Sequence, residues 1–314
     1  MNANPPSLVL LAGGLGSRFG GAKQVEPVGP GGEPLGAYTA FDGLRAGFGE
    51  VVLLTRPGEE PGVRAVFEGA LGADAPLRTV PQRFALPDGV RAPATRDRPW
   101  GTGHALLAAA AATPGRIGVA NADDGYGRGA MIALHRALAS AADGDAVLVT
   151  YPLATVLSPH GGVSRGWVRT GASGAEVVEV HDLERRSAGE GASGRTETGD
   201  AVVLPLDTPV SMNLWGLTPG AVAALRDEWA RFVGDLDRHP GGPDRAEFQL
   251  STALTALARR GRLRIVPQEG GSVWFGITWP DDLARVRGAV EALHRSGAYP
   301  VPLAAVPPFT RSSP

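Results

Sequence analysis

The chain has 314 residues, of which 43% are hydrophobic, and a formal net charge of −2. This length can bury one large core, while the near-neutral charge offers no basic field for nucleic acid. The absence of cysteine excludes disulfides, thiolate metal sites and a cysteine nucleophile. The apolar run at 7–12 is too short to span a bilayer and no basic segment precedes it, so we expect a cytoplasmic protein without a membrane partner.

Short apolar runs alternate with helical patterns in the first half of the chain. Such alternation predicts a mostly parallel sheet with helices on both faces, and ligands then bind beyond the carboxyl ends of the strands. The predicted strands are 8–12, 51–55, 77–80, 117–120 and 146–150, and the predicted helices are 34–47, 104–113 and 130–142.

The second half of the chain has a less regular pattern. Short strand-like runs, broken by a polar glycine- and serine-rich stretch at 187–199, predict a small antiparallel β-rich insertion. We therefore expect one α/β domain over residues 1–297 and a proline-rich tail over 298–314. The predicted strands are 166–170, 176–181, 201–205, 263–266 and 273–278, and the predicted helices are 219–233, 247–259 and 280–295.

A glycine-rich turn, AGGLGSR over residues 12–18, follows the first predicted strand. Successive backbone amides in such a turn can bind a polyphosphate, and Arg18 and Lys23, the only lysine of the chain, can add positive charge. A P-loop does not fit, because Gln24 follows the lysine. The dinucleotide-binding pattern does not fit either, because its third glycine comes one residue late, at Gly20.

The motif LAGGxGSR with a downstream lysine resembles the signature of the nucleotide-sugar pyrophosphorylases, which are sugar-1-phosphate nucleotidyltransferases. The longer string at 16–30 resembles a less characterised bacterial branch, and the resemblance extends over about 7–293. It implies the GT-A-like fold, a Rossmann-like mixed and mostly parallel sheet, with an NTP-binding half at about 7–150 and a sugar-phosphate-binding half at about 151–297. It assigns NTP binding to Ala12, Gly13, Gly14, Gly16 and Ser17, and catalysis to Arg18 and Lys23.

Two further motifs of the first half resemble parts of the nucleotide site. The resemblance implies that Gln82, after the third strand, hydrogen-bonds the base through its amide. In WGTGHA at 100–105 it places Gly101 under the base, and we expect Thr102 to cap the helix that follows. We interpret His104 as structural, because a phosphate nucleophile needs no general base.

The sequence NADD at 121–124 ends a predicted buried strand, where a metal-bound triphosphate is expected. Mg²⁺ can be held by one or two carboxylates together with phosphate oxygens and water. Neighbouring side chains of an extended strand point in opposite directions, so we expect only one aspartate to face the metal. The resemblance selects Asp123, as a catalytic residue and as the Mg²⁺ ligand.

The chain departs from the family near its C-terminus. Many relatives carry Trp-x-Asp-x-Gly, whose aspartate is a second metal ligand, whereas this chain has Trp274 followed by Gly276 at that position. Three outcomes are open: Asp123 and water complete the metal shell, Asp281 or Asp282 compensates, or the site is impaired. We favour the first.

The resemblance also implies a sugar-phosphate site, formed by Gly162, Glu179 and Asn213. The implied reaction transfers NMP from an NTP to a sugar or cyclitol 1-phosphate and releases pyrophosphate. One alternative is a GT-A-type glycosyltransferase, which Ala122-Asp123-Asp124 disfavours because it lacks Asp-x-Asp spacing. The other is a non-catalytic regulator that binds a nucleotide or sugar phosphate. The identities of the NTP and of the sugar stay open, as does a homo-oligomeric state.

Overall fold

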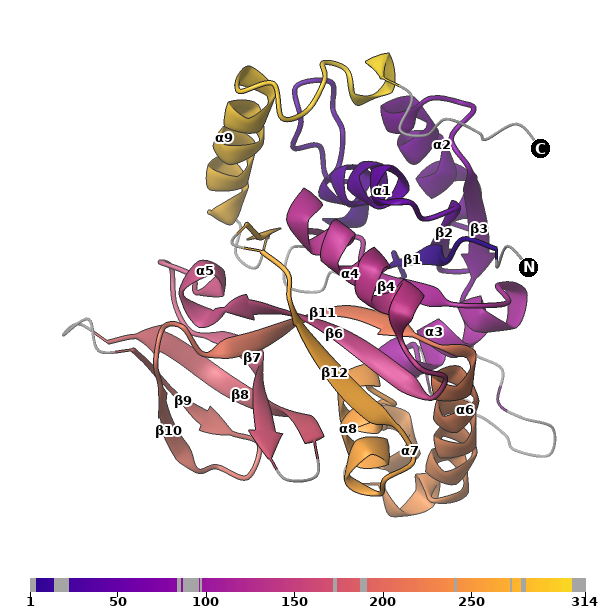
Figure 1. Ribbon diagram of the computed structural model, residues 1–314, viewed down its shortest axis with the longest axis vertical. Coiled ribbons are helices and arrows are strands. Elements are labelled where there is room, and N and C mark those ends of the chain that lie inside the picture. Colours follow the sequence, from indigo (N-terminus) through magenta and orange to yellow (C-terminus); the bar gives the residue numbers. More distant parts are fainter. Residues whose placement is uncertain are drawn as a thin grey trace.

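The computed structural model describes residues 4–13, 23–83, 86, 96, 98–171, 174–186, 191–239, 242–271, 273–277 and 281–306, with only the backbone of Lys23. Its centre is a sheet in which four parallel strands lie in the order β3-β2-β1-β4 (Figure 1). In β1, β2 and β4 successive apolar residues are buried, as in parallel strands covered by helices on both faces, whereas the edge strand β3 is mostly half-buried. The strands are β1 (Ser7–Leu11), β2 (Glu50–Thr55), β3 (Leu77–Pro81) and β4 (Ile117–Asn121), which confirms the first four predicted strands.

Helices cover both faces of the sheet, as predicted. One hydrophobic cluster joins the sheet to α1, α2, α4 and α9, and the other joins it to α3, α6 and α8. Successive residues of β1 alternate between the clusters, with Leu8 and Leu10 in the first and Val9 in the second. These helices are α1 (Leu35–Ala46), α2 (Glu60–Leu71), α3 (Thr102–Ala112), α4 (Arg128–Ser140), α6 (Pro219–Gly234), α8 (Leu250–Arg259) and α9 (Asp282–Arg295).

The strand β11 (Pro209–Leu217) joins the parallel strands to an antiparallel extension, seen at the lower left of Figure 1. Its end at 215–217 pairs with β4, and its beginning at 210–211 pairs with β7. The register against β6 shifts between these two parts. The other strands of this sheet are β6 (Asp145–Pro152), β7 (Val163–Gly171), β8 (Gly174–Arg185), β9 (Ala192–Thr196), β10 (Ala201–Leu204) and β12 (Arg264–Glu269).

Three local predictions were wrong or incomplete. The stretch at 187–199 was expected only to interrupt the antiparallel strands, but it contains β9, which pairs with β8 and β10. The strand expected at 273–278 is reduced to β13 (Phe275–Gly276), which pairs with β5 (Asp124–Gly125). The helix α2 was not predicted.

The structure also describes short helices, which are α5 (Leu153–Val156), α7 (Gly242–Arg245), η1 (Lys23–Val25), η2 (Leu236–Arg238) and η3 (Leu303–Ala305).

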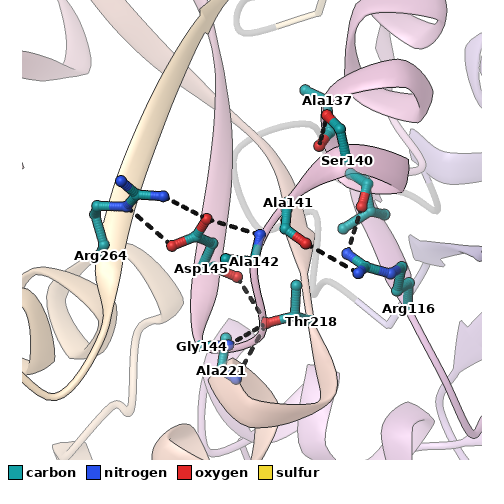
Figure 2. A network of polar contacts seen from close by, with 11 residues as sticks. Arg116, Ala137, Ser140, Ala141, Ala142, Gly144, Asp145, Thr218, Ala221 and Arg264 are labelled. Atoms are coloured by element: carbon teal, nitrogen blue, oxygen red, sulfur yellow. Dashed lines mark hydrogen bonds and ion pairs between the residues drawn. The ribbon is translucent and has the colours of Figure 1, made fainter.

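A polar network around Asp145 ties several elements together at the edge opposite the carboxyl ends of the parallel strands (Figure 2). The Asp145 carboxylate accepts two hydrogen bonds from the Arg264 guanidinium of β12, at 3.0 and 2.8 Å, and one from the Ala142 amide, at 3.0 Å. The hydroxyl of Thr218, the N-cap of α6, donates to the Asp145 carbonyl oxygen at 2.9 Å. The network therefore connects β6, β12, α6 and the end of α4.

No described helix is long and apolar enough to cross a membrane.

Candidate active site

A cleft of about 450 Å³ opens between the carboxyl edge of the parallel strands and the antiparallel extension. Five of the predicted site residues line it, although they come from four separate parts of the chain. These five are Gly101, Thr102, Asp123, Glu179 and Asn213. Sequence reasoning missed other residues of its lining, among them Asn121, Asp124, Arg165, Gly166, Ser211 and Trp274.

The remaining predicted residues lie beside the cleft or outside the described residues. Ala12 is buried directly after β1, and a Cβ at Gly13 would lie 3.2 Å from Oε1 of Gln82. Gly162 faces the backbone of Asp182 on β8, whereas the glycine of β7 that lines the cleft is Gly166. Outside the described residues lie Gly14, Gly16, Ser17, Arg18 and the side chain of Lys23.

Both aspartates of the NADD sequence line the cleft. The expectation that only one would face it assumed an extended strand, but β4 ends at Asn121, Asp123 lies in the turn that follows, and Asp124 is the first residue of β5. The buried carboxylate of Asp124 accepts hydrogen bonds from Asn121 Nδ2 at 2.8 Å and from the Tyr126 hydroxyl at 3.3 Å. Burial raises the pKa of Asp124, and the neighbouring charge of Asp123 raises it further.

A chain of hydrogen bonds connects this turn to β11. The carboxylate of Asp124 can only accept from Asn121 Nδ2, so the Asn121 amide presents Oδ1 on its other side. That oxygen accepts from Asn213 Nδ2 at 2.8 Å. Because Nδ2 of Asn213 donates to Asn121, Oδ1 of Asn213 is left as an acceptor at the cleft. Asn213 has φ of 60°, a left-handed conformation that asparagine tolerates better than most residues, and it lies where the register of β11 shifts.

The turn at 100–103 is held against the segment before α8. The amide of Phe248 donates to the Trp100 carbonyl oxygen at 2.6 Å, and the amide of Gly103 donates to the Phe248 carbonyl oxygen at 2.9 Å. Gly101 has φ of 101°, and a Cβ there would lie 2.7 Å from the Phe248 carbonyl oxygen, so a glycine is required at this close approach. The Thr102 hydroxyl accepts from the amide of Leu250 at 3.0 Å. Thr102 therefore caps α8, and not α3 as expected.

The side chain of Gln82 is packed between this turn and the end of β1. Its Nε2 lies 3.5 Å from the Gly101 carbonyl oxygen and 3.3 Å from Nδ1 of His104. The His104 ring is buried against Trp229, with 4.8 Å between ring centroids. Burial lowers the pKa of His104 to about 4, with a smaller contribution from the charge of Arg96. This environment fits the structural role predicted for His104.

Residues 8–152 match the family model described as the MobA-like NTP transferase domain. This segment is therefore similar to that domain, and we call it the MobA-like domain. It runs from β1 to the end of β6, so it contains the glycine-rich turn, Gln82, Gly101 and Asp123. Glu179 and Asn213 lie beyond it. No curated protein shows significant sequence similarity to the chain.

Among the solved structures that resemble this chain, two nucleotidyltransferases cover more than nine tenths of it. One is a UDP-glucose pyrophosphorylase complexed with UDP-glucose, with 16% identity, a TM-score of 0.52, and coverage of 91% of this chain and 98% of the other. The second is the inositol-1-phosphate CTP transferase from T. maritima, with 11% identity, a TM-score of 0.58, and coverage of 94% and 98%. At these identities the likeness shows the fold. The MobA-like domain and the segment after it together have the GT-A-like arrangement, a mixed and mostly parallel sheet flanked by helices.

The carboxyl groups of the MobA-like domain fit a divalent cation. Asp123 and Asp124 lie together at the cleft, and two adjacent carboxylates repel each other unless a cation or a proton intervenes. Among the described residues no group of three or more histidine or acidic side chains is positioned to hold a metal. Mg²⁺ needs fewer protein ligands than that, because phosphate oxygens and water complete its shell.

Gly276 lies directly opposite Asp124 in the pairing of β13 with β5. A Cβ at Gly276 would lie 2.2 Å from atoms of the Trp274 indole and 3.0 Å from Oδ1 of Asp124. The indole therefore fills the space that a carboxylate side chain would need. Asp282, one of the candidates to compensate, is buried at the start of α9 and forms an ion pair with Arg285 at 3.2 Å.

Proposed function

We propose that this protein transfers an NMP group from an NTP to a sugar 1-phosphate, or to a sugar-like cyclitol phosphate, and releases pyrophosphate. We also propose that residues 1–297 act as one domain and that Mg²⁺ is required. The observation that carries this proposal is the cleft, in which Asp123 of the MobA-like domain faces the same space as Glu179 and Asn213 of the antiparallel extension.

In the proposed reaction an oxygen of the acceptor phosphate attacks the α-phosphorus of the NTP. A new P–O bond forms, the bond from the α-phosphorus to the bridging oxygen breaks, and pyrophosphate leaves with both electrons of that bond. The nucleophile is already anionic, so the protein contributes orientation and charge neutralisation. Mg²⁺ bound by Asp123 would neutralise negative charge on the phosphates.

The other roles follow from the family resemblance and, for the residues that the structure describes, from their positions at or beside the cleft. The amides of the glycine-rich turn and Arg18 hold the leaving pyrophosphate, and Lys23 reduces the repulsion between the two substrates' phosphates. Gly101 and Gln82 lie next to each other, where the resemblance places the base. Glu179 accepts hydrogen bonds from hydroxyl groups of the acceptor through its carboxylate. Asn213 accepts through Oδ1, because one N–H of its Nδ2 group is bonded to Asn121.

The decisive experiment is an assay of pyrophosphate release over a panel of NTPs and acceptors, with Mg²⁺ added. Glucose 1-phosphate and inositol 1-phosphate belong in the panel, because one similar structure is a UDP-glucose pyrophosphorylase and another an inositol-1-phosphate CTP transferase. We expect pyrophosphate only when an NTP and an acceptor are both present.

The variant Asp123→Ala should lower kcat by about 100-fold or more, because an electrostatic contribution to the transition state is lost. Asp227→Ala is the control, since Asp227 is exposed on α6, away from the cleft. Tight NTP binding without pyrophosphate release from any pair would support the regulator instead. Consumption of a nucleotide-sugar with release of a nucleoside diphosphate would support the glycosyltransferase.

A further inference from the structure

Arg165 is a buried cation in the wall of the cleft. It lies on β7, where the pairing with β8 shifts register, and it is 9% exposed. Its Nε and Nη2 donate to the Val156 carbonyl oxygen at 3.0 and 2.6 Å, and its Nη1 donates to the Ser164 carbonyl oxygen at 2.9 Å. The guanidinium lies over the Trp274 ring, 5.1 Å from its centroid. These contacts hold the side chain in one orientation.

The charge of Arg165 has no ion-pair partner within the part of the chain that the structure describes. Burial lowers the pKa of Arg165, while the carboxylates of Asp124, Glu179 and Asp282 raise it from a longer distance. A buried cation is costly unless it is paired and hydrogen-bonded. A guanidinium also has more N–H groups than the three bonds to carbonyl oxygens occupy. Both features suit a cation that receives an anionic ligand.

We propose that Arg165 binds the phosphate group of the acceptor substrate, a phosphate monoester. This inference rests on the proposed function, and it names the group that positions the nucleophile. Arg165 belongs to the wall that also carries Glu179, beyond the MobA-like domain, whereas the glycine-rich turn expected to hold the NTP follows β1. The next residue after Arg165, Gly166, has no side chain to narrow the cleft, and a Cβ there would lie 2.6 Å from Cγ1 of Val177.

The fixed guanidinium also has a consequence for the reaction. A phosphate monoester carries up to two negative charges, and Asp123 and Asp124 line the same cleft. Arg165 would offset that repulsion and could bind two phosphate oxygens at once through its planar fork. The attacking oxygen would then approach the α-phosphorus in a defined orientation.

The test measures binding of inorganic phosphate by calorimetry, with the NTP subsite filled by an α,β-methylene NTP. The variants are Arg165→Met, which removes the charge, and Arg165→Lys, which keeps the charge without the fork. Arg169→Met is the matched control, because Arg169 lies on the same strand, is 52% exposed and pairs with Glu176 outside the cleft. We expect Arg165→Met to weaken phosphate binding at least tenfold, Arg165→Lys to weaken it less, and the control to leave it unchanged.

The affinity of each variant for the methylene NTP, measured separately, should stay within twofold of the wild type. Unchanged phosphate affinity in Arg165→Met, no phosphate binding by the wild type, or an equal loss of NTP and phosphate affinity would each overturn the proposal. If Arg165→Met does not fold, Glu179→Gln in the otherwise wild-type chain gives the second readout. The substitution removes a negative charge that acts on Arg165, so phosphate should bind severalfold more tightly. An unchanged phosphate affinity would count against Arg165 as the group that binds the phosphate.

These titrations need no turnover, so the two proposals can fail separately. A protein that binds phosphate through Arg165 but forms no pyrophosphate with any NTP would contradict the proposed function alone. A protein that turns over normally after Arg165→Met would contradict the role of Arg165 alone.

Discussion

At the scale of single residues, Asn213 combines a backbone and a side-chain role. Its left-handed backbone lies between the part of β11 that pairs with β7 and the part that pairs with β4. Its side-chain amide completes the chain of hydrogen bonds from Asp124. Both roles suit asparagine, which tolerates positive φ and has a donor and an acceptor on one short side chain.

The two roles can be separated by comparing Asn213→Gly with Asn213→Ala. Both variants lose the bond to Asn121, but only alanine is strained at φ of 60°. We expect the alanine variant to be less stable than the glycine variant by about 1 kcal/mol, measured by urea unfolding. Equal stabilities would show that the bend of β11 tolerates a Cβ.

His104 should make the stability of the protein depend on pH. Its pKa is lowered from 6.5 to about 4 in the folded state, so between these values the unfolded chain binds more protons. The contribution is fully present above about pH 6.5 and is lost as the pH falls toward 4, on the order of 3 kcal/mol in total.

His104→Gln should remove this part of the pH dependence, because glutamine does not titrate. Urea unfolding of both proteins at several pH values from about 7 to about 4 measures the difference. A slope that is the same in both proteins would mean that His104 is not the titrating group.

Residues in motifs could be predicted from the sequence better than residues in the walls of the cleft. Asp123 and Asn213 stand out because buried apolar strands surround them and because asparagine is scarce. Arg165 does not stand out, since arginine is the usual cation of this chain and nothing in its neighbours shows that it is buried. Gly166 was missed in favour of Gly162 for a related reason, because the register of β7 against β8 depends on long-range pairing.

At the scale of elements, α8 begins with a cap from another helix. The Thr102 hydroxyl accepts from the amide of Leu250, a fully buried residue, across 148 positions of sequence. Thr102→Val keeps the shape of the side chain but removes the acceptor, so we expect a loss of about 1 kcal/mol in unfolding free energy. Thr102→Ser should keep most of that stability. Thermal and urea unfolding of both variants provide the measurement, and equal losses would mean that the methyl group, not the hydroxyl, matters.

The elements differ in how clearly their own residues predict them. The parallel strands β1, β2 and β4 could be predicted because burial on both faces makes them largely apolar along their length. In α2, Val63, Phe67, Ala70 and Leu71 have helical spacing and are buried, but the glycines and the proline of that segment obscured the pattern. In β9 the residues are small and polar, because it lies in the antiparallel extension and is mostly half-buried or exposed.

At the scale of the whole molecule, the Asp145 network holds together elements far apart in sequence. Hydrogen bonds from Arg264, and to a smaller extent from the Ala142 amide, hold the pKa of Asp145 below its usual value of 3.8. The stabilisation is therefore present above about pH 3.8 and is lost as the pH falls through the lower, folded-state pKa.

We expect Asp145→Asn to be less stable than the wild type at about pH 6, with a difference that shrinks at about pH 3. The Arg264 side chain is largely exposed, so solvent screens the pair and added salt should reduce the difference. Asp227→Asn is the control, because its ion pair with Arg262 is exposed on both sides and should contribute little. A difference independent of pH would indicate that packing, not charge, is lost.

The division of β11 between two partners limits how the protein can move. The strand that pairs with β4 on one side of the bend pairs with β7 on the other, so the two walls of the cleft are parts of one hydrogen-bonded sheet and not bodies on a flexible linker. Wide opening would have to break ladder hydrogen bonds next to Asn213. Substrates should therefore meet a cavity whose shape is already set, and discrimination among acceptors should depend on that shape more than on closure around them.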